Sequence, residues 1–423
     1  MLSIVCWFTL IVIAFILYIW RFKKVVTPMS FIFVLWMTLF LIITSGVTAF
    51  PVLSFLSFSM IFLALLSFVI GCVLASRSDI SISSGNIFTQ KEKKKLTFLL
   101  VISIPLIFYS VYFFILKLLT VGLEGYLMET KWGGEQVNIF SGGLGYSVVT
   151  VFLKGFIYAS FFYSLSLFYL LKEKMYLYVS TFLILSYSIV LFSRVEMLVV
   201  FFSVFVAIFL VKKLTVELVF KVSIFLIISL IFLILFSYVR SGNTLTMGEV
   251  FLKYLIDYHL YGITIFGLVI DDKVVVDGIG TGYGLLTFPI ISFFPEHIIS
   301  LLQGERFLSP ATEARGLMQK EVLITFTDGT YIKTNAFFTS LYLFYKDFGV
   351  TGVVVFPLLY GYFFSKSYLC WLVNRNPIDL ALVIFWSYTG YTALFFPPQI
   401  AEFYWFCFLS LLFIKYRFKQ VVN

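Results

Sequence analysis

The chain has 423 residues, of which 61% are hydrophobic and only 12% are charged, and its mean hydropathy is +1.05. Soluble domains carry about 25% charged residues, so this chain lacks the polar surface that a water-soluble fold needs. The net charge is +9, but Lys and Arg cluster in short segments between apolar runs, which is typical of topology signals. We therefore predict an all-α integral membrane protein with no nucleic-acid partner.

Metal and disulfide chemistry find little support in the sequence. Only His259 and His297 are present, and the four cysteines lie in or at the ends of apolar runs without any Cys-x-x-Cys pair. Such cysteines are typical of small core residues. We expect neither a metal ion nor a cofactor.

Apolar runs of about 17 to 25 residues, the length that crosses a bilayer, recur along the chain. The first run has no basic residues before it and is followed by Arg21, Lys23 and Lys24. This order favours a membrane span with its N-terminus outside over a signal peptide. The eleven predicted spans cover residues 2–20, 29–49, 53–75, 97–119, 147–171, 176–192, 195–211, 219–238, 350–372, 378–396 and 400–414.

The distribution of Lys and Arg orients these spans. One set of connections, which includes a lysine cluster at 91–95 and the C-terminal tail, is rich in basic residues and is predicted to be cytoplasmic. The opposite short connections carry only Lys117, Lys131 and Arg194. The predicted organisation is an eight-helix bundle over 1–238, a large external loop over 239–349 and three helices over 350–423.

The loop over 239–349 is too long for a simple connection, and long loops usually carry function. Residues 247–270 look helical and largely apolar, and residues 285–303 are apolar and contain Pro289 and Pro295. Each segment fits either a helix that lies in the membrane interface or one that re-enters the membrane. If both crossed the membrane, two spans would be added and the orientation would be unchanged.

Arg194 lies in a very short external connection, Ser193-Arg194-Val195-Glu196, where the positive-inside rule disfavours a cation. Ser193 and Glu196 have capping-box spacing, which predicts the start of a helix. The N–H groups and dipole of such a helix end favour an anion, and an Arg adds a fork suited to phosphate. The alternative is an interfacial anchor neutralised by Glu196. We interpret Arg194 as part of an anion site.

Arg240 ends the eighth predicted span at the same face. A cation is favourable at any helix C-terminus, but two external arginines on adjacent spans are also placed to converge on one diphosphate. Asp257 and His259 interrupt an apolar segment, so each is either a candidate general base or a side chain that faces water. Other loop residues are solvated side chains or substrate ligands, and the candidates among them are Tyr258, Arg306, Arg315, Lys333, Asn335 and Asp347.

The end of the loop carries the most distinctive motif. Residues 334–361 read TNAFFTSLYLFYKDFGVTGVVVFPLLYG, in which Asp347 fits either an N-cap or a substrate ligand. This stretch, with Arg194 after a serine and Arg240 after a tyrosine-containing helix end, resembles the O-antigen polymerases (Wzy type). The number of spans and the place of the loop extend the resemblance over nearly the whole chain.

The resemblance implies a GT-C-like fold of about eleven transmembrane helices with amphipathic helices in a periplasmic loop. It implies a metal-independent glycosyltransferase of the bacterial inner membrane, whose site faces the periplasm. The donor would be a glycan on undecaprenyl diphosphate, the acceptor a lipid-linked repeat unit, and a chain-length regulator a further partner. Physical reasoning agrees, because a diphosphate leaving group needs preorganised cations, which Arg194 and Arg240 would supply.

Two alternatives remain open from the sequence. O-antigen ligases share this architecture but usually carry a His-Asn pair where this chain has Thr334 and Asn335, which favours a polymerase. A flippase or another transporter of lipid-linked oligosaccharides would carry polar residues at mid-membrane depth, and the predicted spans are nearly free of charge there.

Overall fold

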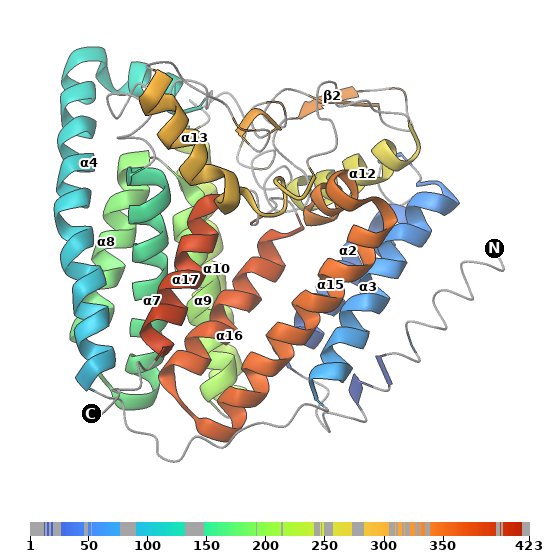
Figure 1. The fold of residues 1–423 in the computed structure, drawn as a ribbon, viewed down its shortest axis with the longest axis horizontal. Helices are drawn as coiled ribbons and strands as arrows, with labels where there is room; N and C mark the ends of the chain where they lie inside the picture. The colour runs from blue at the N-terminus through green and yellow to red at the C-terminus, as the bar shows by residue number, and fades with distance from the viewer. Residues whose placement is uncertain are drawn as a thin grey trace. The chain divides into compact units, whose positions relative to one another are not determined.

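The chain is almost entirely helical wherever the computed structural model describes it (Figure 1). It divides into two compact units, both built from segments far apart in the sequence. The structure describes a set of main segments, with a few shorter stretches between them. The main segments are 27–45, 53–76, 90–131, 148–191, 193–212, 215–240, 257–272, 283–303, 322–325, 331–334, 339–394 and 401–416.

Unit one comprises Met1–Ile80, Leu245–Leu369 and Trp386–Glu402. It also contains most of α15 (Ser340–Asn374) and the last turns of α16 (Pro377–Thr392). Its other elements are α2 (Pro28–Thr44), α3 (Phe55–Ala75), α12 (Tyr258–Ile270), α13 (Pro289–Gln303), β1 (Val322–Thr325) and β2 (Tyr331–Thr334).

Unit two comprises Ser81–Thr244, Cys370–Phe385 and Phe403–Asn423. It includes the first turns of α16 and nearly all of α17 (Glu402–Lys415). Its other elements are α4 (Gln90–Lys131), the π-helix η1 (Val148–Leu153), α7 (Lys154–Leu171), α8 (Met175–Leu191), α9 (Arg194–Val211) and α10 (Val216–Arg240).

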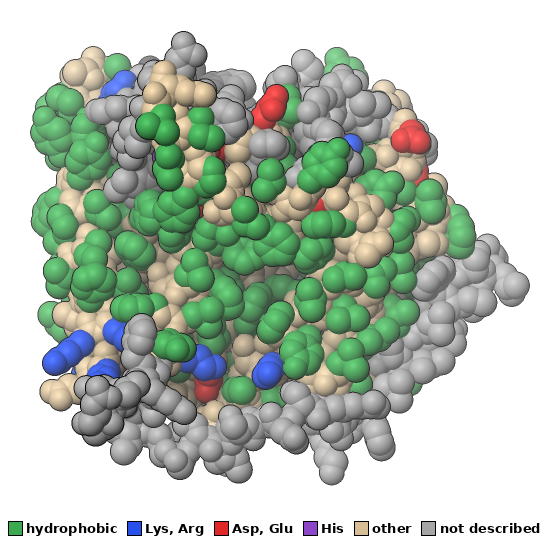
Figure 2. All heavy atoms as spheres, viewed as in Figure 1, with side chains coloured by type: hydrophobic (Ala, Val, Ile, Leu, Met, Phe, Trp, Pro, Cys, Tyr) green, Lys and Arg blue, Asp and Glu red, His purple; other side chains and the backbone are tan. Residues whose placement is uncertain are grey.

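Several helices are suited to a membrane, as predicted. Among the described residues, four are long and apolar enough to cross it: Phe55–Ala75, Gln90–Gly122, Val149–Leu171 and Ser340–Asn374. Hydrophobic side chains run along α4 in Figure 2. The predicted membrane class is therefore supported, while the count of eleven spans and the boundaries at 238 and 349 stay predictions.

A glycine break divides α15 into two arms. Gly349 has a φ of 59° and a ψ of −145°, a conformation that glycine adopts at little cost. The arms fold against each other, because the rings of Phe344 and Phe356 stack at 4.7 Å and the backbone of Phe344 crowds Gly352. The short arm thus lies on the first turns of the long arm.

Glycines bring α3 and α15 into direct backbone contact. A Cβ at Gly71 would collide with the carbonyl oxygen of Leu358, and a Cβ at Gly361 with that of Phe68. Small residues permit this approach between helices in lipid, where dispersion rather than water release drives packing. Asp271, after α12, adds a polar tie to the start of α3, because its carboxylate accepts hydrogen bonds from Ser54 N, at 3.2 Å, and from the Ser57 hydroxyl.

The loop also contains a small antiparallel sheet that was not predicted. β1 pairs with β2 so that Val322 lies opposite Thr334 and Leu323 opposite Lys333. The four-residue strands are too short to show clear alternation in the sequence.

Gly361→Ala is expected to lower the free energy of unfolding by about 1 to 3 kcal/mol, the usual range for overpacking. The added methyl would meet the Phe68 backbone, which cannot move without displacing α3. Thermal unfolding of the purified protein in detergent measures the loss. Gly248→Ala is the matched control, since a methyl there meets nothing within 4 Å. Equal stability of both variants would contradict the close crossing.

Candidate functional site

The two ends of unit two differ in their charge. At one end, Lys95 at the start of α4 donates hydrogen bonds of 2.6 Å to the Phe413 and Tyr416 carbonyls at the end of α17. Lys93 pairs there with Glu173, just after α7, at 2.9 Å. Lysine side chains gather at this end of α4 (Figure 2). We call it the lysine-rich end.

The opposite end of unit two holds a buried ion pair. Lys154, the first residue of α7, lies about 27 Å from the lysine-rich end, given 1.5 Å of rise per residue. Its Nζ is 2.8 Å from Glu196 Oε1 on α9, and the two side chains are 13% and 0% exposed. Tyr158 donates a hydrogen bond of 3.3 Å to the same carboxylate. Charge is therefore buried among apolar helices, but it is paired.

Aromatic rings complete the surroundings of Lys154. Its ammonium lies 4.1 Å from the ring centroid of Phe403 and 5.6 Å from that of Tyr158, both within the range of cation–π attraction. Gly155 allows this packing, because a Cβ there would crowd Phe406 and the Phe403 carbonyl. Glu196 Oε2 is buried and has no hydrogen-bond partner within the described part of the chain. It can therefore accept one more donor.

Arg194 and Arg240 lie at this same end of unit two. α9 begins at Arg194, α10 ends at Arg240, and the two helices pack against each other as consecutive antiparallel elements. The side chains of both arginines lie outside the described residues. The predicted capping box does not form, since the Ser193 hydroxyl makes no capping bond and Glu196 turns to Lys154.

In unit one, His259 has a specific partner. Its Nε2 lies 2.9 Å from the hydroxyl of Tyr391, near the end of α16, and both side chains are partly buried. The bond fixes the orientation of the imidazole ring. Asp257, the N-cap position of α12, makes no capping bond, and its side chain is half-buried.

Asp347 is also held in unit one. Its Oδ2 accepts hydrogen bonds from the backbone N and the hydroxyl of Thr287, at 2.7 and 2.6 Å. The residue is only 8% exposed, and Oδ1 has no hydrogen-bond partner among the described residues. Its two observed bonds therefore tie the loop to α15. The remaining predicted site residues lie outside what is described: Arg306, Arg315 and Asn335 entirely, and the side chains of Tyr258 and Lys333.

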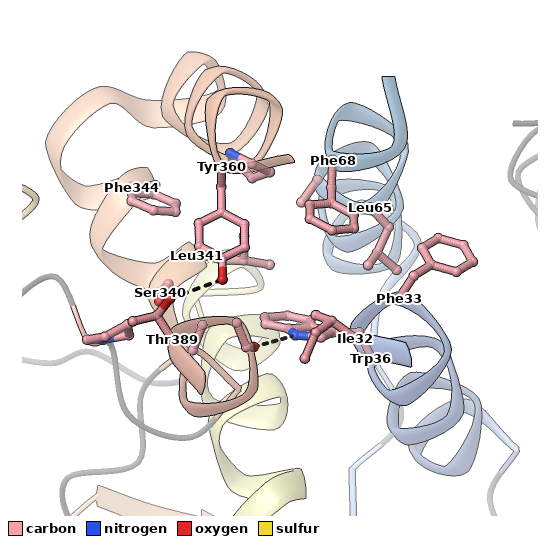
Figure 3. A pocket seen from close by; sticks show the side chains of 15 residues that line it. Ile32, Phe33, Trp36, Leu65, Phe68, Ser340, Leu341, Phe344, Tyr360 and Thr389 are labelled. Atoms are coloured by element: carbon pink, nitrogen blue, oxygen red, sulfur yellow. Dashed lines mark hydrogen bonds between the residues drawn. The ribbon is translucent and has the colours of Figure 1, made fainter. Parts of the chain in front are cut away.

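Unit one has an apolar cavity of about 100 Å³ (Figure 3). Its lining includes Gly390, the residue before Tyr391 in the sequence. Polar groups on its wall already have partners: Trp36 Nε1 donates to the Gly390 carbonyl at 3.3 Å, and the Tyr360 hydroxyl donates to the Trp386 carbonyl. Such a cavity suits hydrocarbon rather than sugar or phosphate. It is lined by Ile32, Phe33, Trp36, Ala64, Leu65, Phe68, Ser340, Leu341, Phe344, Pro357, Tyr360, Thr389, Gly390, Ala393 and Pro398.

No family model, curated protein or solved structure matches the chain.

Three residues that make the polar contacts described above were not predicted from the sequence, namely Lys154, Tyr158 and Tyr391. Lys154 carried a usable signal, because it is a lone lysine inside the predicted span 147–171, and ionisable residues in such spans are usually functional.

Lys154→Met is expected to destabilise the protein by about 3 to 5 kcal/mol, because Glu196 would keep a buried, unpaired charge. Adding Glu196→Gln should recover much of the loss. Thermal unfolding of the parent, both single variants and the double variant gives the coupling energy.

The exposed pair Lys93–Glu173 provides the matched control for this cycle. Its side chains are each 37% exposed, so its coupling should stay below about 1 kcal/mol. Similar couplings for the two pairs would show that the Lys154 pair is not desolvated.

Proposed function

We propose that this protein polymerises glycan repeat units carried on undecaprenyl diphosphate at the periplasmic face of a bacterial inner membrane. The observation that carries the proposal is the gathering of cationic positions at one end of unit two. Lys154, Arg194 and Arg240 lie there, opposite the lysine-rich end. The positive-inside rule assigns the lysine-rich end to the cytoplasm and these three residues to the outside.

The proposed reaction transfers the growing glycan from its lipid diphosphate to the acceptor repeat unit. An acceptor hydroxyl attacks the anomeric carbon of the donor, the bond from that carbon to the diphosphate oxygen breaks, and undecaprenyl diphosphate leaves with the electron pair. Arg194 and Arg240 would bind the developing negative charge through forked, charge-assisted hydrogen bonds. The hydroxyl proton goes to a general base, the role that the sequence suggests for His259.

Lys154 has a supporting role in this proposal. It holds Glu196, which lies two residues after Arg194 on the first turn of α9. The ion pair therefore fixes the start of α9 against α7. It also engages the one acid on that turn, so that Glu196 competes less with phosphate for Arg194.

Transport of lipid-linked oligosaccharide is the second candidate function, and the buried Lys154–Glu196 pair favours it. Ionisable pairs inside helical bundles often mark the path of a substrate or a proton. A ligase remains the nearest alternative among transferases. Vesicles that contain the purified protein and a lipid-linked repeat unit separate these functions: longer lipid-linked chains mark a polymerase, and movement without elongation marks a transporter.

Arg194→Ala and Arg240→Ala are each expected to slow elongation by at least about 100-fold, the usual cost of removing one preorganised donor. Products should then stop at a single repeat unit. Gel separation of the products formed by the purified variants measures chain length. Arg194→Lys and Arg240→Lys should each recover little of the lost elongation rate, because an ammonium cannot form the bidentate contact.

Lys221→Ala is the matched control for the arginine variants. Lys221 is an exposed cation on α10, near the end opposite to Arg240, where it pairs with Glu217 at 2.6 Å. Chain length should be unchanged in this variant. Parental chain length in both Arg→Ala variants would rule out the proposed site.

His259→Ala is expected to lower the rate by about 10² to 10⁴-fold if the imidazole acts as general base. Tyr391→Phe should cost less and should shift the pH profile, because it removes the hydrogen bond that orients the ring. The double variant should be no slower than His259→Ala alone, since Tyr391 acts through His259. Additive losses, or a pH profile that neither change moves, would exclude this role.

A further inference from the structure

One face of α13 carries a continuous apolar stripe. Ile291, Phe294, Ile298 and Leu302 are spaced three or four residues apart, and they are between 50% and 81% exposed. At 100° per residue they fall on one side of the helix. Hydrophobic side chains are visible on the outward face of α13 in Figure 2. Four large apolar side chains would be costly to leave in water.

The opposite face of α13 is fastened to the loop that follows it. Glu296 is buried, and its Oε2 accepts a 2.7 Å hydrogen bond from the Thr312 hydroxyl and a 3.3 Å bond from Ser309 N. Phe293 is buried on this side as well, beside the ring of His297 at 4.4 Å. The helix therefore has a fixed polar and packed side, so its apolar stripe cannot simply turn inward.

The start of α13 is anchored at the outer end of a membrane-spanning helix. Thr287, two residues before α13, bonds Asp347, and the ring of Phe288 lies 5.7 Å from that of Phe356. Asp347 and Phe356 bracket Gly349, where the long arm of α15 begins. That arm, over 350–374, is about 37 Å long, which exceeds the ~30 Å hydrocarbon core, so its first turns reach the interface.

We propose that α13 is an interfacial helix, with its Ile291–Phe294–Ile298–Leu302 stripe inserted into the hydrocarbon edge of the extracytoplasmic leaflet. Phe348 and Val350, on either side of Gly349, are also exposed large apolar side chains. The occupant of the surface is the phospholipid bilayer, because the depth of α13 is set by its anchor on a spanning helix. Amphipathic helices bind membranes in this way.

The proposal has a consequence for the loop. Since Glu296 holds Ser309 and Thr312 on the face opposite the stripe, these two residues are kept beside a membrane-bound helix. The contact would therefore fix this part of the loop at the membrane surface, where lipid-linked molecules present their headgroups. The insertion itself is independent of the proposed polymerase activity.

Spin-label depth measurements on the full chain in phospholipid nanodiscs test the insertion. Ile298→Cys and Leu302→Cys are labelled separately, and the signal of the labelled parent chain is subtracted because it retains its native cysteines. Oxygen concentrates in hydrocarbon, whereas a nickel chelate stays in water. At both positions oxygen should relax the label more strongly than the nickel chelate.

Gln303→Cys is the matched control, because Gln303 is an exposed residue about 100° around the helix from Leu302. At position 303 the nickel chelate should relax the label more strongly than oxygen does. Stronger relaxation by nickel at 298 and 302 would place the stripe in water and overturn the proposal. Protection from both reagents would mean that protein covers the stripe, which would overturn it as well.

Discussion

Hydrocarbon as the solvent is the constraint on which the rest of this structure depends. A backbone in lipid must satisfy its own hydrogen bonds, so the chain forms helices, and those helices cannot use water release to find one another. Close contact between helix backbones takes the place of that driving force. Gly71 and Gly361 let the backbones of α3 and α15 touch, and Gly155 does the same for α7 and α17. These contacts leave no room for a single methyl group, so the register of each crossing is fixed.

The same solvent explains why the charged side chains that the structure describes in unit two have partners or lie near the ends of helices. In unit two, lysines gather where α4 begins and where α7 and α17 end, within reach of carbonyls and Glu173. The Lys154–Glu196 pair differs from these lysines, because it is buried and lies near the opposite end. Desolvating two charges is costly, and an apolar pair of similar volume would often be at least as stable. A selective benefit beyond stability is the natural reason to retain it, and the anion site that we propose at the neighbouring Arg194 would supply one.

Local signals in the sequence predicted much of the helical framework. Ser193 preceded a helix start at Arg194, and the apolar run to 238 predicted a helix that ends at Arg240. A span was predicted to begin at 350, directly after the Asp-Phe-Gly sequence, and the long arm of α15 begins there, after the break at Gly349. Each signal lies within a few residues of the feature it specifies. The polar contacts of the candidate site were not predictable, because Lys154 and Glu196 are 42 residues apart and His259 and Tyr391 are 132 apart.

Asp347 shows why the type of residue alone was not enough. An aspartate near a helix start fits an N-cap, and an aspartate in a long external loop fits a substrate ligand. Its observed bonds instead join Thr287 to α15, which places the start of α13 beside the first turns of a membrane-spanning helix. A loop residue that fits a substrate ligand in the sequence can thus have a structural role instead. If α13 lies in the interface as proposed, a carboxylate at this position would determine where the loop meets the membrane, and thereby which part of a lipid-linked molecule the loop could reach.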